Sequence, residues 1–87
     1  MASIVIHHTV KDYSAWRPIY DEHEKSRTSA GITNAKVFRR AEDPNELVVL
    51  ADVVDVAKAR SWMSSDDLKS AMQKAGVTGP PKIHIIT

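Results

Sequence analysis

The sequence contains no cysteine and only three glycines, no two of which are adjacent. Without cysteine, disulfide scaffolds, thiolate metal sites and cysteine nucleophiles are excluded. Without a glycine-rich loop, the usual phosphate cradle is excluded too. Charge of one sign is not in excess, since 12 Lys and Arg stand against 11 Asp and Glu and leave a net charge of +1. A nucleic-acid partner needs a basic face, so none is expected.

Long apolar runs are also missing, and we therefore expect no membrane segment. Neither a basic region nor a long apolar region precedes Ile4, so we expect no export signal and a cytoplasmic protein. The four histidines form neither an HExxH motif nor an i, i+4 pair, and we expect no metal and no cofactor. The chain does have 87 residues with 43% hydrophobic content, which predicts one globular domain over residues 1–87.

Hydrophobic spacing divides the chain into alternating strands and helices. Runs rich in β-branched residues predict strands over 3–10, 32–41 and 47–54, with turn residues 42–46 between the second and third. Gly79-Pro80-Pro81 breaks the chain before a last strand over 82–87.

The segment between the first and second strands and the segment between the third and fourth strands both have apolar residues at helical spacing. Pro18 predicts a short turn over 12–17, followed by a main helix from Pro18 to a stop at Gly31. Asp55 caps a second helix that runs to about Ser64, and Ser65-Asp66-Asp67 caps its continuation to Gly76. The order β-α-β-β-α-β predicts a ferredoxin-like α+β fold, a four-stranded antiparallel sheet with its helices on one face.

The third strand predicts a partner for the other face of the sheet. Its side chains are apolar on both sides, with Leu47, Val49, Ala51 and Val53 on one side and Val48, Leu50 and Val54 on the other. Two helices cover one face only, so the second face needs a second molecule. We expect a homodimer through the sheet face, which makes a dimeric α+β barrel.

Histidines are the candidates for acid–base chemistry near neutral pH. His7 and His8 are adjacent on a strand and point to opposite faces, His8 toward the helices. His23 lies on one helical stripe with Trp16, Tyr20 and Arg27. We expect His8 and His23 to face each other across an apolar pocket. The candidate catalytic residues are His8 and His23, and the candidate ligand-binding residues are Trp16, Tyr20, Arg27, Trp62, Met72 and His84.

Trp62, Met72 and His84 are candidate site residues because of where they lie in the predicted fold. Trp62 lies at the break of the second helix and Met72 lies on its second half, where a broken helix over a sheet is a natural lid. His84 lies on the last strand, which neighbours the first strand in this topology and places it near one of the two histidines. For each of these residues a purely structural role stays open.

Three segments together resemble a group of small bacterial proteins in the dimeric α+β barrel superfamily, often labelled antibiotic-biosynthesis-monooxygenase-like or cyclase. The segments are His8-x-Val10-x-Asp12-Tyr13-x-x-Trp16-x-Pro18-x-Tyr20-Asp21-x-His23-x-x-x-Arg27-x-x-x-Gly31, Asp43-Pro44-Asn45-Glu46 and Ser65-x-Asp67-Leu68-x-x-Ala71-Met72-x-x-Ala75-Gly76-Val77. Monooxygenases of that superfamily oxidise polycyclic phenols without metal or flavin, in a site between the sheet and the helices of each protomer. The resemblance implies a cofactor-independent monooxygenase-like activity on a small aromatic substrate.

Three functions remain open at this point. The first is a homodimeric cofactor-independent oxygenase in which His8 or His23 takes a proton from a phenolic substrate. The second is a non-catalytic homodimer that binds a small aromatic or apolar ligand through the same residues. The third is a structural protein whose cleft is filled by Trp16 and Trp62.

Overall fold

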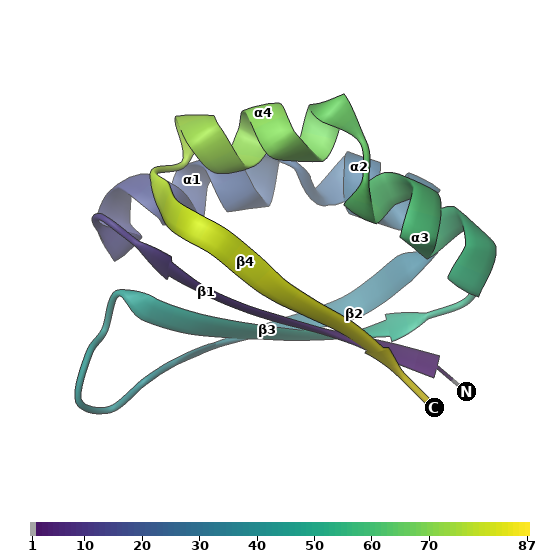
Figure 1. Cartoon of the computed structure of the whole chain (residues 1–87), viewed down its shortest axis with the longest axis horizontal. Coiled ribbons are helices and arrows are strands. Elements are labelled where there is room, and N and C mark those ends of the chain that lie inside the picture. Colours follow the sequence, from purple (N-terminus) through teal and green to yellow (C-terminus); the bar gives the residue numbers. More distant parts are fainter. Residues whose placement is uncertain (1) are drawn as a thin grey trace.

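The computed structural model describes residues 2–87 and has the order β-α-α-β-β-α-α-β (Figure 1). Its elements are β1 (Ala2–Val10), α1 (Tyr13–Glu22), α2 (Glu24–Ser29), β2 (Ile32–Arg39), β3 (Glu46–Val53), α3 (Val56–Met63), α4 (Asp66–Lys74) and β4 (Val77–Ile86). The four strands form one antiparallel sheet in the order β2-β3-β1-β4. The predicted ferredoxin-like fold class is confirmed. None of the helices in residues 2–87 has the length and apolar content needed to span a membrane.

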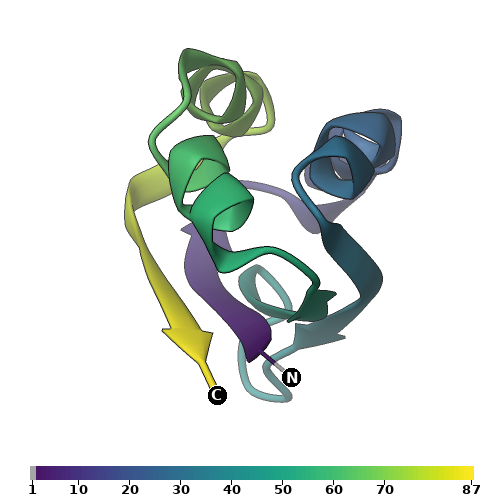
Figure 2. The same cartoon turned by 90° about the vertical axis from the view of Figure 1, so that its right-hand side faces the viewer.

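All four helices lie over the same face of the sheet. Figure 2 shows α1 and α2 on one side and α3 and α4 on the other, both above the strands. Burial alternates along β1, where Ile4, Ile6, His8 and Val10 are buried under the helices. Leu47 and Val49 of β3 face the helices in the same way. The predicted directions of His8 and of the apolar side chains of β3 are confirmed.

The first helical connection breaks at a different place than predicted. Pro18 lies inside α1, and the break falls at His23, whose backbone N–H is shared between the carbonyls of Ile19 and Tyr20 at 3.2 Å each. Proline has a φ angle that suits a helix, so it removes one hydrogen bond without ending the helix here. The Asp12 side chain caps α1 by accepting the Ser14 N–H, as predicted.

The last strand is longer than predicted, because Gly79-Pro80-Pro81 lies inside β4. The register shifts at this point: Thr9 pairs with Thr78, whereas His7 pairs with Lys82. Residues 79–81 therefore form a bulge opposite a single residue of β1, and Gly79 adopts a φ of +68° there. The prolines are tolerated because β4 is an edge strand that donates to only one neighbour. The middle strands differ only at their ends, with β2 and β3 at 32–39 and 46–53 instead of 32–41 and 47–54.

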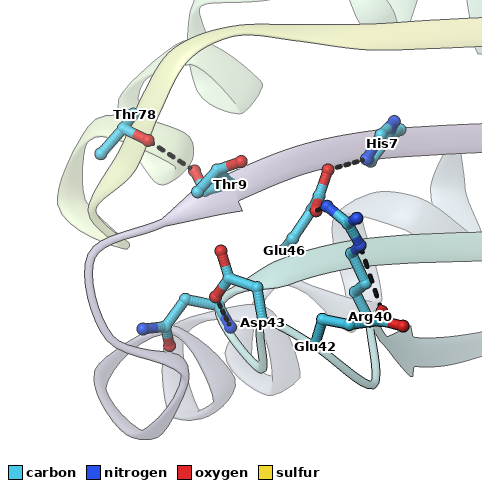
Figure 3. A network of polar contacts seen from close by, with 8 residues as sticks. His7, Thr9, Arg40, Glu42, Asp43, Glu46 and Thr78 are labelled. Carbon is cyan, nitrogen blue, oxygen red and sulfur yellow. Dashed lines mark hydrogen bonds and ion pairs between the residues drawn. The ribbon is translucent and has the colours of Figure 1, made fainter.

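The face of the sheet away from the helices carries apolar side chains with charged groups around them. Phe38 and Leu50 are 52% and 38% exposed on this face. A polar network lies at its edge (Figure 3), in which the Glu46 carboxylate pairs with His7 at 3.0 Å and with Arg40 at 2.7 Å. Hydrogen bonds from Arg40 and then His7 lower the pKa of Glu46. The network therefore holds His7 on the uncovered face, which is the direction predicted for it.

Candidate functional site

A pocket lies between the sheet and the two helix pairs, and its surface is mainly apolar. The cavity has a volume of about 50 Å³, or about 430 Å³ when its open mouth is included. It is lined by Ile6, His8, Trp16, Ile19, Tyr20, His23, Arg27, Val49, Trp62, Leu68, Ala71, Met72 and Ala75. Every described helix and the two central strands contribute to it. Trp16 and Trp62 narrow this cleft but do not fill it.

Seven of the eight predicted site residues line this pocket, and His84 is the one that does not. His84 pairs with Val5 in the sheet and shares its face, so it lies exposed on the side away from the helices. Its neighbours Ile83 and Ile85 are the β4 residues that pack against the core. Because side chains alternate along a strand, this packing turns His84 away from the pocket. The expectation that it lines the ligand site with the others is corrected.

The helix α1 provides a pair of stacked aromatic rings at the pocket. Trp16 stacks on Tyr20 with ring centroids 4.6 Å apart, and the His8 ring meets Trp16 edge-on at 5.6 Å. Trp16 and Tyr20 are four residues apart, so their side chains lie one above the other on the helix. Offset and edge-to-face arrangements of this kind are the favourable ones for aromatic rings. The pair therefore contributes aromatic, mainly apolar surface to the pocket.

His8 is a buried imidazole without a hydrogen-bond partner in the described chain. Only 7% of the residue is exposed, and neither ring nitrogen has a partner among residues 2–87. Burial, with a smaller contribution from His7, lowers the pKa of His8 to about 4. The ring is neutral at neutral pH, with one N–H donor and one acceptor nitrogen. Unsatisfied buried groups destabilise a fold, so these two atoms are available to a ligand.

His23 is held by hydrogen bonds that join the two helix pairs. Its Nε2 lies 2.9 Å from the Asp67 carboxylate, which also accepts the Ser26 hydroxyl at 2.7 Å. The Ser26 hydroxyl in turn accepts the Trp62 Nε1–H at 3.1 Å. The hydrogen bonds from Ser26 and then His23 lower the pKa of Asp67, so the carboxylate is ionised and Nε2 carries the proton. When the ring carries only this proton, its lone pair is on Nδ1.

The sequence pattern indicates only one of the two residues in this contact. His23 was predicted as a pocket residue, whereas Asp67 was interpreted as part of a helix cap. Ser65 is the residue whose side chain caps α4, at the Leu68 N–H, and Asp67 in the same first turn is left to pair with His23. The two residues are 44 positions apart. No local pattern signals such a contact, because it depends on how α4 docks beside α1.

Arg27 is a buried cation at one end of the pocket. It is 7% exposed, and its guanidinium lies 3.8 Å from the centre of the Tyr20 ring. Its Nη1 donates to the Tyr20 carbonyl oxygen at 2.8 Å. Burial lowers the pKa of Arg27, but a guanidinium stays charged in a protein. The pocket therefore combines an apolar wall with one permanent positive charge.

A metal centre is not assembled by the part of the chain that the structure describes. Residues 2–87 contain no group of three or more histidine and carboxylate side chains placed to hold an ion. His8 and His23 are the two pocket residues of a metal-ligating type, and His23 already has its Nε2 on Asp67. The donor set suits hydrogen bonding and proton transfer instead.

No family model and no curated protein matches the chain, whereas solved structures match it along nearly its whole length. One is named "Putative antibiotic biosynthesis monooxygenase" from Bordetella bronchiseptica, with a TM-score of 0.81 and 14% identity over 99% of this chain and 94% of that one. Another is SnoaB from Streptomyces nogalater, a cofactor-independent oxygenase, with a TM-score of 0.76 and 14% identity over 99% and 90%. A third is the protein Rv0793 from Mycobacterium tuberculosis, with a TM-score of 0.71 and 14% identity over 99% and 92%.

These structures share one fold with the chain, and several carry the name of the antibiotic biosynthesis monooxygenases. The resemblance seen in the sequence is therefore confirmed at the level of the fold. The class defined by the fold and the pocket is that of small α+β proteins with an apolar site between sheet and helices.

The pKa of His8 leads to a prediction for stability. The pKa falls from 6.5 to about 4 on folding, so between these values the unfolded chain binds a proton that the folded chain does not. We expect the free energy of unfolding to drop by about 2 kcal/mol from pH 7 to pH 5 through this residue, at ~1.4 kcal/mol per pKa unit. The substitution His8→Phe removes this contribution. Denaturant unfolding of both proteins at the two pH values measures it, and equal losses in both would contradict the prediction.

Proposed function

We propose that the chain is a small oxygenase of the cofactor-independent type that acts on a small aromatic substrate bound in this pocket. The observation that carries the proposal is that His23, oriented by Asp67, and the partnerless His8 line the same apolar cavity. A histidine oriented by a carboxylate is a common arrangement for a general base. The fold that the chain shares with SnoaB supports the reaction type.

In the proposed reaction, Nδ1 of His23 takes the proton of a phenolic hydroxyl. The resulting anion carries electron density on the ring carbon opposite its oxygen, and that carbon reduces dioxygen and forms a C–O bond with it. Loss of water then breaks the O–O bond and leaves a quinone. One phenol and one dioxygen give one quinone and one water, whose hydrogens come from the hydroxyl and from the oxidised ring carbon.

His8 is assigned a different role from His23. Because its pKa is about 4, it is a weak base and does not carry the proton at neutral pH. Its neutral ring can donate one hydrogen bond and accept another, which suits a substrate oxygen and hydroxyl. We therefore assign proton transfer to His23 and orientation of the substrate to His8.

Non-catalytic binding of the same ligand is the second candidate function. The observation that favours it is that the buried His8 nitrogens and the Tyr20 hydroxyl, which have no partner among residues 2–87, can hold a ligand without any proton transfer. For either function the cavity volume of about 50 Å³ sets a limit on the ligand. An apolar cavity of ~150 Å³ accommodates a benzene ring, so a ligand of one ring needs side chains to move first. Met72, with its flexible side chain, is the lining residue best suited to move. The two functions differ in whether a product forms.

A second copy of the chain is the proposed partner. Two rows of cross-strand neighbours run across the uncovered face. They are Phe38–Val48–His7 and Lys36–Leu50–Val5–His84, and they bring apolar side chains together at the centre of this face. The helices cover only the opposite face. A face-to-face pair of such sheets buries these side chains and keeps both pockets open at the helix side. We therefore propose the homodimer expected from the sequence.

Turnover tests the role of His23. The protein is incubated with one-ring and two-ring phenols under oxygen, with oxygen uptake measured by electrode and products by mass spectrometry. We expect His23→Gln to lower the rate by roughly 100-fold or more, since this is the usual contribution of a general base. Asp67→Asn lowers it less, because the base remains but loses its orientation.

Asp66→Asn is the matched control, since it changes an exposed carboxylate next to Asp67 in the same helix turn. Full activity of the His23→Gln variant would show that His23 is not the base. Tight ligand binding with no oxygen uptake and no product in the unchanged protein would instead favour the binding function.

The dimer is tested by mass. We expect native mass spectrometry to give twice the chain mass of 9.7 kDa. Leu50→Glu places a charge at the centre of the uncovered face and is expected to give single chains, because burying an unpaired carboxylate is strongly unfavourable. Ala57→Glu, on the exposed surface of α3, is the control that keeps the dimer. A single-chain mass for the unchanged protein would refute the proposed partner.

A further inference from the structure

The Arg27 guanidinium has no counter-ion in the described chain. No carboxylate among residues 2–87 lies within ion-pair distance of it, and its one hydrogen bond there is from Nη1 to the Tyr20 carbonyl. Nε and Nη2 have no hydrogen-bond partner among residues 2–87, and neither is a fully buried atom. Both nitrogens can therefore donate a hydrogen bond to a ligand.

The nearest acidic residues do not neutralise Arg27 directly. Asp21 forms an ion pair with Arg17 at 3.1 Å, and Glu24 is exposed. Both carboxylates line the outer groove together with Arg17 and Arg27 and act on the charge of Arg27 without forming an ion pair with it. The guanidinium of Arg27 therefore has no carboxylate in direct contact among residues 2–87.

Tyr20 offers a donor at the same end. Its hydroxyl is fully buried and has no hydrogen-bond partner within residues 2–87. Burial raises the pKa of Tyr20 more than the two arginines lower it, so the hydroxyl keeps its proton at neutral pH. A protonated hydroxyl and a guanidinium are both donors, and only an acceptor satisfies them together.

Tyr20 and Arg27 also line a second cavity, which lies outside the pocket between α1–α2 and β2. The two side chains thus form a wall shared by the pocket and this outer groove. A charged ligand oxygen placed at this wall contacts the guanidinium without entering the apolar part of the pocket. The ring that carries the oxygen then contacts Trp16 from the apolar part of the pocket, since the faces of Tyr20 are covered by Trp16 and Arg27.

We propose that the ligand of this pocket binds as an anion, with a carboxylate or phenolate oxygen held by Arg27 and the Tyr20 hydroxyl and with its ring against Trp16. The inference rests on the pocket being the ligand site of the proposed function, but it holds for catalysis and for binding alone. Charge-assisted hydrogen bonds are the strong ones, and the guanidinium geometry suits an oxyanion. Neutral rings of the same shape bind more weakly.

Benzoate and benzamide are the probes that separate charge from shape. Both have one ring and similar size, and only benzoate is an anion at neutral pH. We expect calorimetry or ligand-observed NMR to show that the protein binds benzoate at least about tenfold tighter, and that Arg27→Met removes this preference. Arg27→Lys keeps part of it, and Tyr20→Phe keeps the stacking but reduces the preference. Lys25→Met, an exposed cation of the same helix, is the control that changes nothing.

4-Nitrophenol tests the phenolate form, because its ionised state absorbs visible light. We expect binding to the unchanged protein to lower the apparent pKa of the dye, and binding to Arg27→Met not to do so. A shift for the dye without a preference for benzoate assigns the site to phenolates, and the reverse result assigns it to carboxylates.

Equal affinity of the unchanged protein for benzoate and benzamide, with no shift of the dye, would overturn the inference. So would failure of all the probes to bind. A preference for benzoate that survives in Arg27→Met, once circular dichroism has shown that the variant is folded, would overturn it as well. None of these outcomes depends on oxygen uptake, so the inference and the proposed oxygenase activity can fail separately.

Discussion

Both helical connections cross the same face of the sheet, and the pocket and the uncovered face both follow from this constraint. A connection that joins strands of one sheet turns with a right-handed sense, which brings each helix pair onto the same side. Each connection is divided into two short helices, α1–α2 and α3–α4 (Figure 1). The pocket lies above β1 and β3 and is lined by residues of both helix pairs. The hydrogen bonds from His23 and Ser26 to Asp67 join the two pairs across this space.

The polar groups of the pocket oppose the stability of the fold. The His8 ring nitrogens and the Tyr20 hydroxyl are buried without a hydrogen-bond partner among the described residues, and Arg27, which is 7% exposed, has one hydrogen bond there. Apolar side chains of similar size would remove the desolvation penalty at each position. Groups of this kind are expected where binding or chemistry needs them. Their concentration around one cavity is the physical reason to treat it as a functional site.

The pocket could largely be predicted because two simple periodicities define it. A spacing of three to four residues places Trp16, Tyr20, His23 and Arg27 on one side of a helix, and alternation places His8 under that helix. Both rules tolerate an error in where a helix begins, so the misplaced break at Pro18 did not disturb them. His84 shows the limit of the second rule, since Ile83, Ile85 and Ile86 are apolar on both sides of it. Only the pairing of β4 with β1 decides its face.

Contacts between distant segments could not be predicted in this way. The Asp67 carboxylate meets His23 because α4 docks beside α1 at one particular angle, and the sequence contains no spacing that encodes the angle. The same holds for the unpaired state of Arg27, since acidic residues lie within a few positions of it in the chain. Asp21 forms an ion pair with Arg17, and Glu24 is exposed and forms no ion pair with Arg27 among the described residues. Burial and pairing are properties of the packed structure.

The charge of Arg27 also affects how strong a base the proposed reaction needs. A phenol is a weak acid, and an imidazole alone removes its proton poorly in an apolar site. A buried guanidinium close to the phenol oxygen stabilises the anion strongly, because few water molecules screen it. Binding would then supply much of the ionisation, and His23 would need only to accept the proton and keep its orientation on Asp67. In the proposed reaction the same anion reduces dioxygen, so recognition of charge and activation of the ring would be one interaction in this pocket.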